Sequence, residues 1–163
     1  MDGTDCPIEQ KGKRWYSHKF RKPGVCYEVG VAIISGDICW IKGPLPCGNY
    51  NDLKIFRMAL EKSLDEGEYV ETDLGYQGRN VKSRCPKGPL TAGRPVYTEM
   101  KKRVASRHET VNQRLKIFSC LVKRFRHSCW HHAHCFRAVA ILVQLMMESG
   151  EKLFNADYCD HVD

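Results

Sequence analysis

The spacing of hydrophobic positions changes along the chain, and each spacing predicts a different element. Residues 25–34 are rich in β-branched and apolar side chains, residues 35–37 (Ser-Gly-Asp) read as a turn, and residues 38–41 are apolar again. This pattern predicts a β-hairpin. Both strands are apolar enough to be buried on more than one side, so helices are expected to pack on the sheet. The Gly- and Pro-rich stretch 43–48 is expected to stop the second strand.

Apolar residues spaced three and four apart predict three helices. The first covers residues 53–64 and is preceded by Asn51 and Asp52, which suit a helix start. The second runs from about residue 98 to residue 125. Its apolar stripe consists of Val104, His108, Val111, Leu115, Phe118, Val122 and Phe125. The third covers about residues 135–149 and is nearly apolar, so it is expected to be buried and to end at Gly150.

The remaining segments complete an α/β layout. Residues 69–73 predict a strand, residues 77–96 predict a long, mobile basic loop, and a further short strand is expected near Val81. The order of elements predicts an α/β fold with a mixed sheet flanked by helices. A chain of 163 residues suits one domain, which we place at residues 1–158, followed by an acidic tail at residues 159–163.

Positive charge is concentrated in the second half of the chain. Residues 79–126 hold 14 Lys or Arg and only two acids, Glu99 and Glu109, which gives this segment a net charge of +12. The whole chain carries +7, so the remaining residues carry −5. Such an asymmetry favours a polyanionic partner, and the density of cations favours nucleic acid over a merely solvated helix face.

Cysteine usage and hydropathy bear on the compartment. The nine cysteines are scattered and no signal peptide precedes them, so a reducing compartment is expected rather than a disulfide framework. The longest apolar run, residues 138–147, is too short to span a bilayer, and no membrane association is expected.

Three carboxylates stand out as candidates for chemistry. Asp2 opens the chain, Asp73 ends the predicted strand 69–73, and Glu109 lies within the basic second helix. Hard carboxylate oxygens hold Mg²⁺, and neighbouring cations hold a polyanion. The pattern therefore suggests metal-assisted phosphoryl transfer on nucleic acid, against the simpler reading of three unrelated surface acids.

Several motifs in order resemble the DDE superfamily endonucleases, in the PIF/Harbinger-like branch of eukaryotic DNA transposases. Residues 2–8 (Asp-Gly-Thr-Asp-Cys-Pro-Ile) resemble the opening motif of that family. Residues 43–53 resemble its Gly-Pro-rich segment ending in Asn-Asp, and residues 73–76 (Asp-Leu-Gly-Tyr) resemble its Asp-x-Gly-Tyr motif. Residues 107–112 (Arg-His-Glu-Thr-Val-Asn) resemble the helix with its catalytic Glu. The likeness extends to about Tyr158.

The resemblance implies an RNase H-like fold in which the first strand, a later strand and a helix bring carboxylates to one end of the sheet. Asp2, Asp73 and Glu109 would then be both the catalytic residues and the ligands of two Mg²⁺ (or Mn²⁺) ions. The implied activity is that of a Mg²⁺-dependent DNA endonuclease or transposase that cleaves phosphodiester bonds by in-line attack in the nucleus.

Further residues near these motifs have open alternatives. Asp52 is interpreted as a helix N-cap, with a supporting role near the metals as the alternative. Asp5 could replace Asp2, although residues three apart on a strand face opposite sides. Arg107, Arg114 and Lys116 on the second helix are expected to hold a DNA backbone, whereas residues 101–103 (Lys-Lys-Arg) read as its solvated start rather than a nuclear localisation signal. The Cys- and His-rich run 129–135 has no established zinc-ligand spacing, and zinc is disfavoured.

The start of the chain motivates a rival function. The resemblance implies a first strand that extends upstream of Asp2, but only Met1 precedes it. The first strand is therefore expected to be truncated, and the rival is a truncated or domesticated, non-catalytic DNA-binding protein derived from a transposase. Either function would have DNA as partner, with a homodimer or a separate DNA-reading protein as a possible addition.

Overall fold

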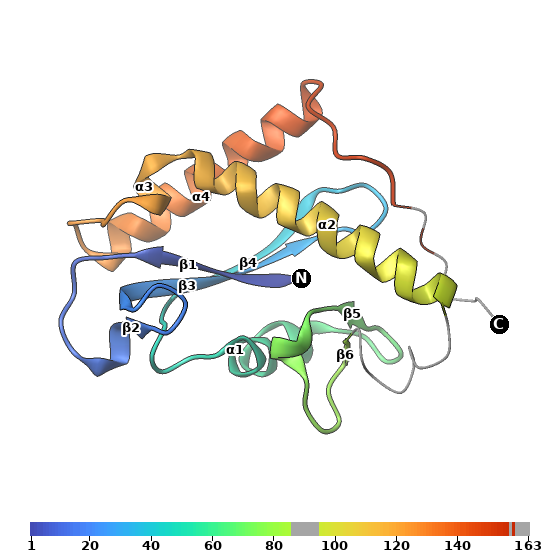
Figure 1. Ribbon diagram of the computed structural model, residues 1–163, viewed down its shortest axis with the longest axis horizontal. Coiled ribbons are helices and arrows are strands. Elements are labelled where there is room, and N and C mark those ends of the chain that lie inside the picture. Colours follow the sequence, from blue (N-terminus) through green and yellow to red (C-terminus); the bar gives the residue numbers. More distant parts are fainter. Residues whose placement is uncertain (86–94, 157, 159–163) are drawn as a thin grey trace.

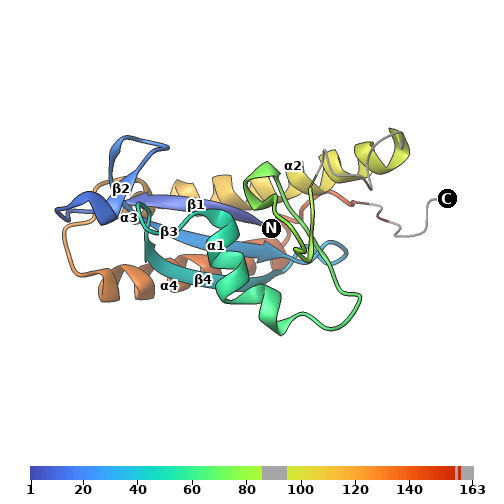
Figure 2. The same cartoon turned by 90° about the horizontal axis from the view of Figure 1, so that it is seen from below.

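The computed structural model describes residues 1–85, 95–156 and 158. A four-stranded sheet lies between two layers (Figure 1). Helices α2, α3 and α4 cover one face, and α1 with the small β5–β6 pair lies on the other side (Figure 2). The strands are β1 (Asp2–Pro7), β2 (Tyr16–Ser17), β3 (Lys22–Val31), β4 (Ile38–Pro46), β5 (Val70–Glu71) and β6 (Ser83–Arg84). The α-helices are α1 (Asp52–Met58), α2 (Pro95–Ile117), α3 (Ser119–Val122) and α4 (Cys129–Glu148), and the 3₁₀ turns are η1 (Lys13–Trp15), η2 (Leu60–Ser63) and η3 (Leu74–Tyr76).

Strand β3 is the centre of the main sheet. It pairs antiparallel with β1, in a register that sets Asp2 opposite Val29, and antiparallel with β4 and β2. Among the described residues, β5 and β6 pair parallel in a separate two-stranded sheet, and an isolated parallel bridge joins Ile8 and Phe125. The predicted α/β organisation is therefore confirmed. The RNase H-like arrangement stays a prediction.

The apolar core consists of two clusters on opposite sides of the main sheet. Val25, Tyr27 and Val29 face α2, α3 and α4, in a cluster that includes Leu115 and Phe136. The ring of Tyr27 lies parallel to the ring of Phe136, with centroids 3.7 Å apart. A second cluster on the opposite side is built on Phe56, Tyr76 and Cys85, with Met1 at its edge and Trp40 packed against it. Alternate residues of β3 thus enter the helix-side cluster, as the two-residue period of a strand requires.

The predicted hairpin is confirmed, but its second strand is longer than expected. Strand β4 continues through Gly43 and a cis Gly43–Pro44 peptide bond as far as Pro46. The strand therefore ends within the predicted stretch 43–48, but later than expected. Strand β4 pairs with β3 on one side and is otherwise an edge of the sheet, and Pro is tolerated at a sheet edge because no ladder partner needs its missing N–H.

The long second helix is interrupted where the sequence shows no break signal. Helix α2 ends at Ile117, and Phe118 adopts an extended conformation before α3. This turn leaves Ile117 70% exposed and places Leu121 fully in the core. Packing of Leu121 replaces the continuous stripe that the spacing predicted, which is a case of tertiary contacts overriding helix periodicity. The predicted loop 77–96 includes residues 86–94, which lie outside the described residues, as do 157 and 159–163 of the predicted tail region.

Helix α4 begins earlier than predicted and is buried on one face only. It starts at Cys129, where the side chain of Ser128 caps it. Phe136 and Val143 are fully buried, whereas Ile141 is 61% exposed. The sequence predicted that this helix is buried on all sides, and this was wrong for the face of α4 that carries Ile141. Within the described residues, no helix combines the length and apolarity needed to span a bilayer.

A buried carboxyl group lies within the sheet itself. Glu28 of β3 is fully buried, and its Oε2 accepts a hydrogen bond of 2.9 Å from Nε1 of Trp40. Its Oε1 has no hydrogen-bond partner among the described residues. Burial raises the pKa of Glu28 to about 7, from an ordinary value of 4.5, because the charged form loses its hydration.

The raised pKa of Glu28 predicts a pH-dependent stability. Between pH 4.5 and 7 the folded protein keeps the proton of Glu28, whereas the unfolded chain loses it. The stabilisation is complete below the ordinary pKa and is lost as the pH rises through the folded pKa, at most about 3 kcal/mol in free energy of unfolding. Glu28→Gln should remove this decline in urea unfolding measured across that range. The exposed control Glu66→Gln should keep it, and an equally steep decline in Glu28→Gln would refute the assignment.

Candidate active site

Three distant segments of the chain bring the predicted carboxylates to one cavity. Asp2 opens β1, Asp73 precedes η3, and Glu109 lies in the middle of α2. All three line the same cavity of about 560 Å³. It also borders Glu71 and Lys101. Sequence analysis therefore identified residues that the fold places around a common space.

The carboxylate of Asp2 is oriented on both of its oxygens. The backbone N–H of Gly3 donates to Oδ1 at 2.7 Å, and Nδ2 of Asn112 donates to Oδ2 at 3.0 Å. Each oxygen accepts one hydrogen bond from the described residues and keeps a further lone pair. The half-buried side chain is thus held in place without being saturated.

The other two carboxylates are more exposed. Asp73 is the N-cap of η3, and its Oδ1 accepts a hydrogen bond of 2.9 Å from the N–H of Gly75. This local contact explains why the Asp-Leu-Gly-Tyr segment forms a tight turn that presents Asp73. Glu109 is exposed, and its carboxylate has no hydrogen-bond or ion-pair partner in the described part of the chain. Its side chain is therefore available to a ligand.

Asp52 belongs to this site and does not cap its helix. The N-cap of α1 is Asn51, whose side chain accepts from the N–H of Lys54, and Asp52 is the first helical residue. The interpretation of Asp52 as the cap was therefore wrong. Its carboxylate lies against Gly3 and Gly75, where a Cβ on Gly75 would be 3.0 Å from Oδ2 and a Cβ on Gly3 would be closer still to Oδ1.

The neighbouring acids affect the pKa of Asp52. Burial raises the pKa of Asp52, the ammonium of Lys19 lowers it, and the negative charges of Asp2 and Asp73 raise it further. The charges of Asp2 and Asp73 thus add to the effect of burial on Asp52, because like charges nearby disfavour its ionised form. Asp5 lies apart from the cavity, and its Oδ2 accepts from Oγ of Ser17 at 2.6 Å. Asp2 and Asp5 thus have different surroundings.

Lys19 is the site cation that the sequence did not reveal. Its Nζ donates to the carbonyl of Gly3 at 3.1 Å. Burial lowers its pKa, but the carboxylates of Asp52, Asp5 and Asp2 outweigh this and raise it. Lys19 follows the two-residue strand β2, whose pairing with β3 brings the loop towards the carboxylates. A two-residue strand leaves no periodic signal, so its position could not be predicted.

The cations predicted to hold DNA have other partners in the structure. Arg107 is only 4% exposed, and its guanidinium donates to the carbonyls of Ile33 and Ile34. Arg114 donates to the carbonyl of Glu151 at 2.5 Å. The ammonium of Lys116 donates to the carbonyl of Asp5. These contacts anchor α2 to neighbouring segments, and DNA binding by Arg107, Arg114 and Lys116 stays a prediction.

Comparison with known families agrees with this geometry. The family described as DDE superfamily endonuclease matches residues 1–144, which is most of the chain. The chain belongs to this family. No curated protein and no solved structure matches it significantly. Membership indicates a transposase-type nuclease that acts on DNA, in line with three carboxylates around one cavity.

The donor set of this DDE domain suits a hard divalent cation. Its candidate ligands are carboxylate oxygens, which Mg²⁺ and Mn²⁺ prefer, and the carboxylate of Glu109 is unpartnered among the described residues. Within those residues, no three His, Cys, Asp or Glu side chains are close enough together to hold a metal ion. The type of donor atom therefore fits a divalent cation, but the spacing does not yet. The exposed side chains of Asp73 and Glu109 would have to turn inward to surround the ion.

The Cys- and His-rich run of this DDE domain contributes a histidine to the core. His132 is fully buried, and its Nδ1 lies 2.7 Å from the hydroxyl of Tyr27. Burial lowers the pKa of His132 to about 4. His134 is exposed and contacts Trp130 edge to face. The helix is continuous from Cys129, but His132 serves the core of the domain.

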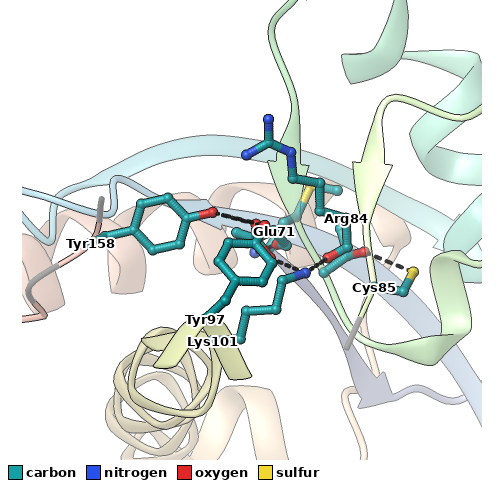
Figure 3. A network of polar contacts seen from close by, with 8 residues as sticks. Glu71, Arg84, Cys85, Tyr97, Lys101 and Tyr158 are labelled. Atoms are coloured by element: carbon teal, nitrogen blue, oxygen red, sulfur yellow. Dashed lines mark hydrogen bonds and ion pairs between the residues drawn. The ribbon is translucent and has the colours of Figure 1, made fainter. Parts of the chain in front are cut away.

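A buried ion pair holds Asp73 near Glu109. Glu71, two residues before Asp73, forms an ion pair of 2.5 Å with Lys101 of α2, and both side chains are nearly inaccessible. The hydroxyls of Tyr97 and Tyr158 donate to Oε1 of Glu71 at 2.9 and 2.5 Å. Figure 3 shows Tyr97, Tyr158 and Lys101 converging on this carboxylate. Lys101 also donates to the carbonyl of Arg84, which ties β6 to the same helix.

Removing one partner of this pair should be costly. Lys101→Met leaves the carboxylate of Glu71 buried without its countercharge, so we expect a loss of about 3–5 kcal/mol in the free energy of unfolding. Lys102→Met is the matched control, because Lys102 forms an exposed pair with Glu99 and should matter little. Urea denaturation measures both. In the double variant Glu71→Gln/Lys101→Met, much of the lost stability should be recovered. Equal stability of Lys101→Met and the control Lys102→Met would contradict the role of the pair.

Proposed function

We propose that this domain is a metal-dependent DNA endonuclease of the PIF/Harbinger-like branch, which cleaves phosphodiester bonds as part of transposition. The observation that carries the proposal is the convergence of Asp2, Asp73 and Glu109 on one cavity in a chain of the DDE family. No two of these residues are neighbours in the sequence, so a shared cavity is not a local effect of the chain. A nuclear location is part of the proposal, because the sequence resembles transposases of eukaryotes.

The carboxylates of Asp2, Asp73 and Glu109 would hold two Mg²⁺ or Mn²⁺ ions. When bound there, the ions would activate a water or a DNA 3′-hydroxyl and stabilise the leaving oxygen. The RNase H-like arrangement is part of the proposal, because β1, the segment after β5 and helix α2 are the elements that such a fold uses for its ligands.

The protein residues have separate tasks in this reaction. Asp2 is fixed by its two hydrogen bonds and supplies an oriented ligand. Asp73 and Glu109 are exposed, so they can adapt when DNA and metal arrive together. Lys19 places one positive charge beside four aspartates and can contact a phosphate oxygen of the bound strand. Contacts of this kind position DNA without reading its sequence, so target choice would need a DNA-reading partner or a second copy.

Removing a ligand should abolish cleavage while leaving the fold intact. Asp73→Asn and Glu109→Gln keep the size of each side chain, and we expect each to reduce Mg²⁺-dependent nicking of supercoiled plasmid by more than about 100-fold. Matched controls are Asp65→Asn and Glu99→Gln, which change exposed acids that do not line the cavity. Circular dichroism should be unchanged throughout. Undiminished nicking in either ligand variant would remove that residue from the site.

The rival function is a non-catalytic DNA-binding protein. It is favoured by one observation, the absence of a set of three metal-ligating side chains already in contact among the described residues. This function predicts DNA binding that weakens with salt, no cleavage with Mg²⁺ or Mn²⁺, and the same affinity for DNA in Asp73→Asn as in the wild type. The nicking assay and a gel-shift titration at two salt concentrations separate the two functions.

A further inference from the structure

Helix α2 carries a buried polar pair beside the candidate ligand Glu109. His108 and Asn112 are four residues apart and therefore share a face of the helix. Their exposed fractions are only 5% and 8%, whereas Glu109 is exposed. Buried polar side chains are costly unless they are hydrogen-bonded, so their partners define what the pair does.

The partners of His108 and Asn112 determine which of their atoms donate hydrogen bonds and which accept them. Nε2 of His108 lies 2.8 Å from the carbonyl oxygen of Val29, and because a carbonyl only accepts, Nε2 carries the proton. Nδ1 of the neutral ring is then an acceptor. It faces Nδ2 of Asn112 at 3.5 Å, and the same Nδ2 donates to Oδ2 of Asp2 at 3.0 Å.

These partners fix the orientation of the Asn112 amide. Both neighbours of Nδ2 are acceptors, the ring nitrogen of His108 and the carboxylate of Asp2, so only the amino group can face them. The reverse orientation would point the amide oxygen at two acceptors. The oxygen instead lies buried without a partner among the described residues, and this arrangement is held by the two contacts of the amino group.

We infer that Asn112, oriented by His108, is a positioning residue that fixes the carboxylate of Asp2 for binding a divalent cation. The inference rests on the proposed function of the cavity. Asn112 takes one lone pair of Oδ2 and the N–H of Gly3 takes one of Oδ1, which leaves the other lone pairs for a ligand. Without Asn112 the carboxylate of Asp2 could rotate about its side-chain bonds. Metal binding would then be weaker, because the ion would have to order the carboxylate.

The predicted consequence is a loss of metal affinity without loss of the fold. Asn112→Leu retains approximate size but has no donor, and we expect it to weaken Mn²⁺ binding by about 10- to 100-fold in calorimetry without DNA. Asn112→Ala is a second variant that removes the donor without adding a charge, and it should weaken binding by a similar factor. Val143→Ala is the control, because Val143 is a fully buried residue of the apolar core on another helix, α4. It should lower the unfolding midpoint and leave the Mn²⁺ affinity unchanged.

A double-mutant cycle distinguishes positioning from general damage to the helix. His108→Leu should weaken Mn²⁺ binding in the wild type, because the amide of Asn112 loses its orienting partner. It should have no further effect on affinity in Asn112→Leu, because both residues act through the same donor. Additive losses would contradict the inference.

The result for other variants separates this inference from the proposed function. If Asp73→Asn abolishes Mn²⁺ binding but both Asn112 variants bind like the wild type, the positioning role is wrong and the metal site stands. If the wild type binds no Mn²⁺, or Asp73→Asn binds as tightly as the wild type, the metal site and the positioning role are both overturned.

Discussion

The crossing of α2 over β1 and β3 is the contact on which the site depends. The helix is held there by apolar packing of Val111 and Leu115 and by the buried hydrogen bonds of His108 and Asn112. Apolar contacts alone tolerate small shifts, whereas a buried polar group that loses its partner costs about 1–3 kcal/mol. The polar pair therefore fixes the position of α2 along its axis. Because Glu109 follows His108 directly, the same constraint decides that this carboxylate borders the cavity.

The candidate site concentrates negative charge. Asp2, Asp52 and Asp73 lie close enough to one another that burial and mutual repulsion raise the pKa of Asp52. Lys19 offsets part of this repulsion. Glu71 and Lys101, which also border the cavity, form an ion pair, so together they add no net charge to the site. A divalent cation among the remaining aspartates would stabilise them more than one lysine does, which agrees with the proposed metal dependence.

Much of the fold was predictable from local patterns, because its main elements are long and periodic. The hairpin of β3 and β4, the presence of three helical regions and the short strand before Asp73 follow from spacing alone. The break at Phe118 was not predictable, because it arises from burial of Leu121 and no Gly or Pro marks it. Nor was the exposed face of α4, since an apolar helix that packs on one side has the same composition as one that is fully enclosed.

The candidate site was also predictable in part: its carboxylates could be named from the sequence, but the partners of its buried groups could not. The resemblance picked out Asp2, Asp73 and Glu109, and the chain folds so that all three line one cavity. The partners of buried groups depend on contacts between distant segments, such as Lys101 with Glu71 and Asn112 with Asp2. A basic residue in the sequence does not reveal whether it faces solvent, so the burial of the Arg107 guanidinium against backbone carbonyls could not be predicted.

The most direct test of the central claim is to locate bound Mn²⁺ by paramagnetic broadening of backbone amide signals in the NMR spectrum of the isolated protein. We expect substoichiometric Mn²⁺ to broaden first the amide signals of Gly3, Gly75 and Glu109, which come from three separate elements around one cavity. Broadening of these three signals should disappear in Asp73→Asn. If Mn²⁺ leaves them sharp, or broadens only signals remote from the cavity, the three carboxylates do not form a metal site.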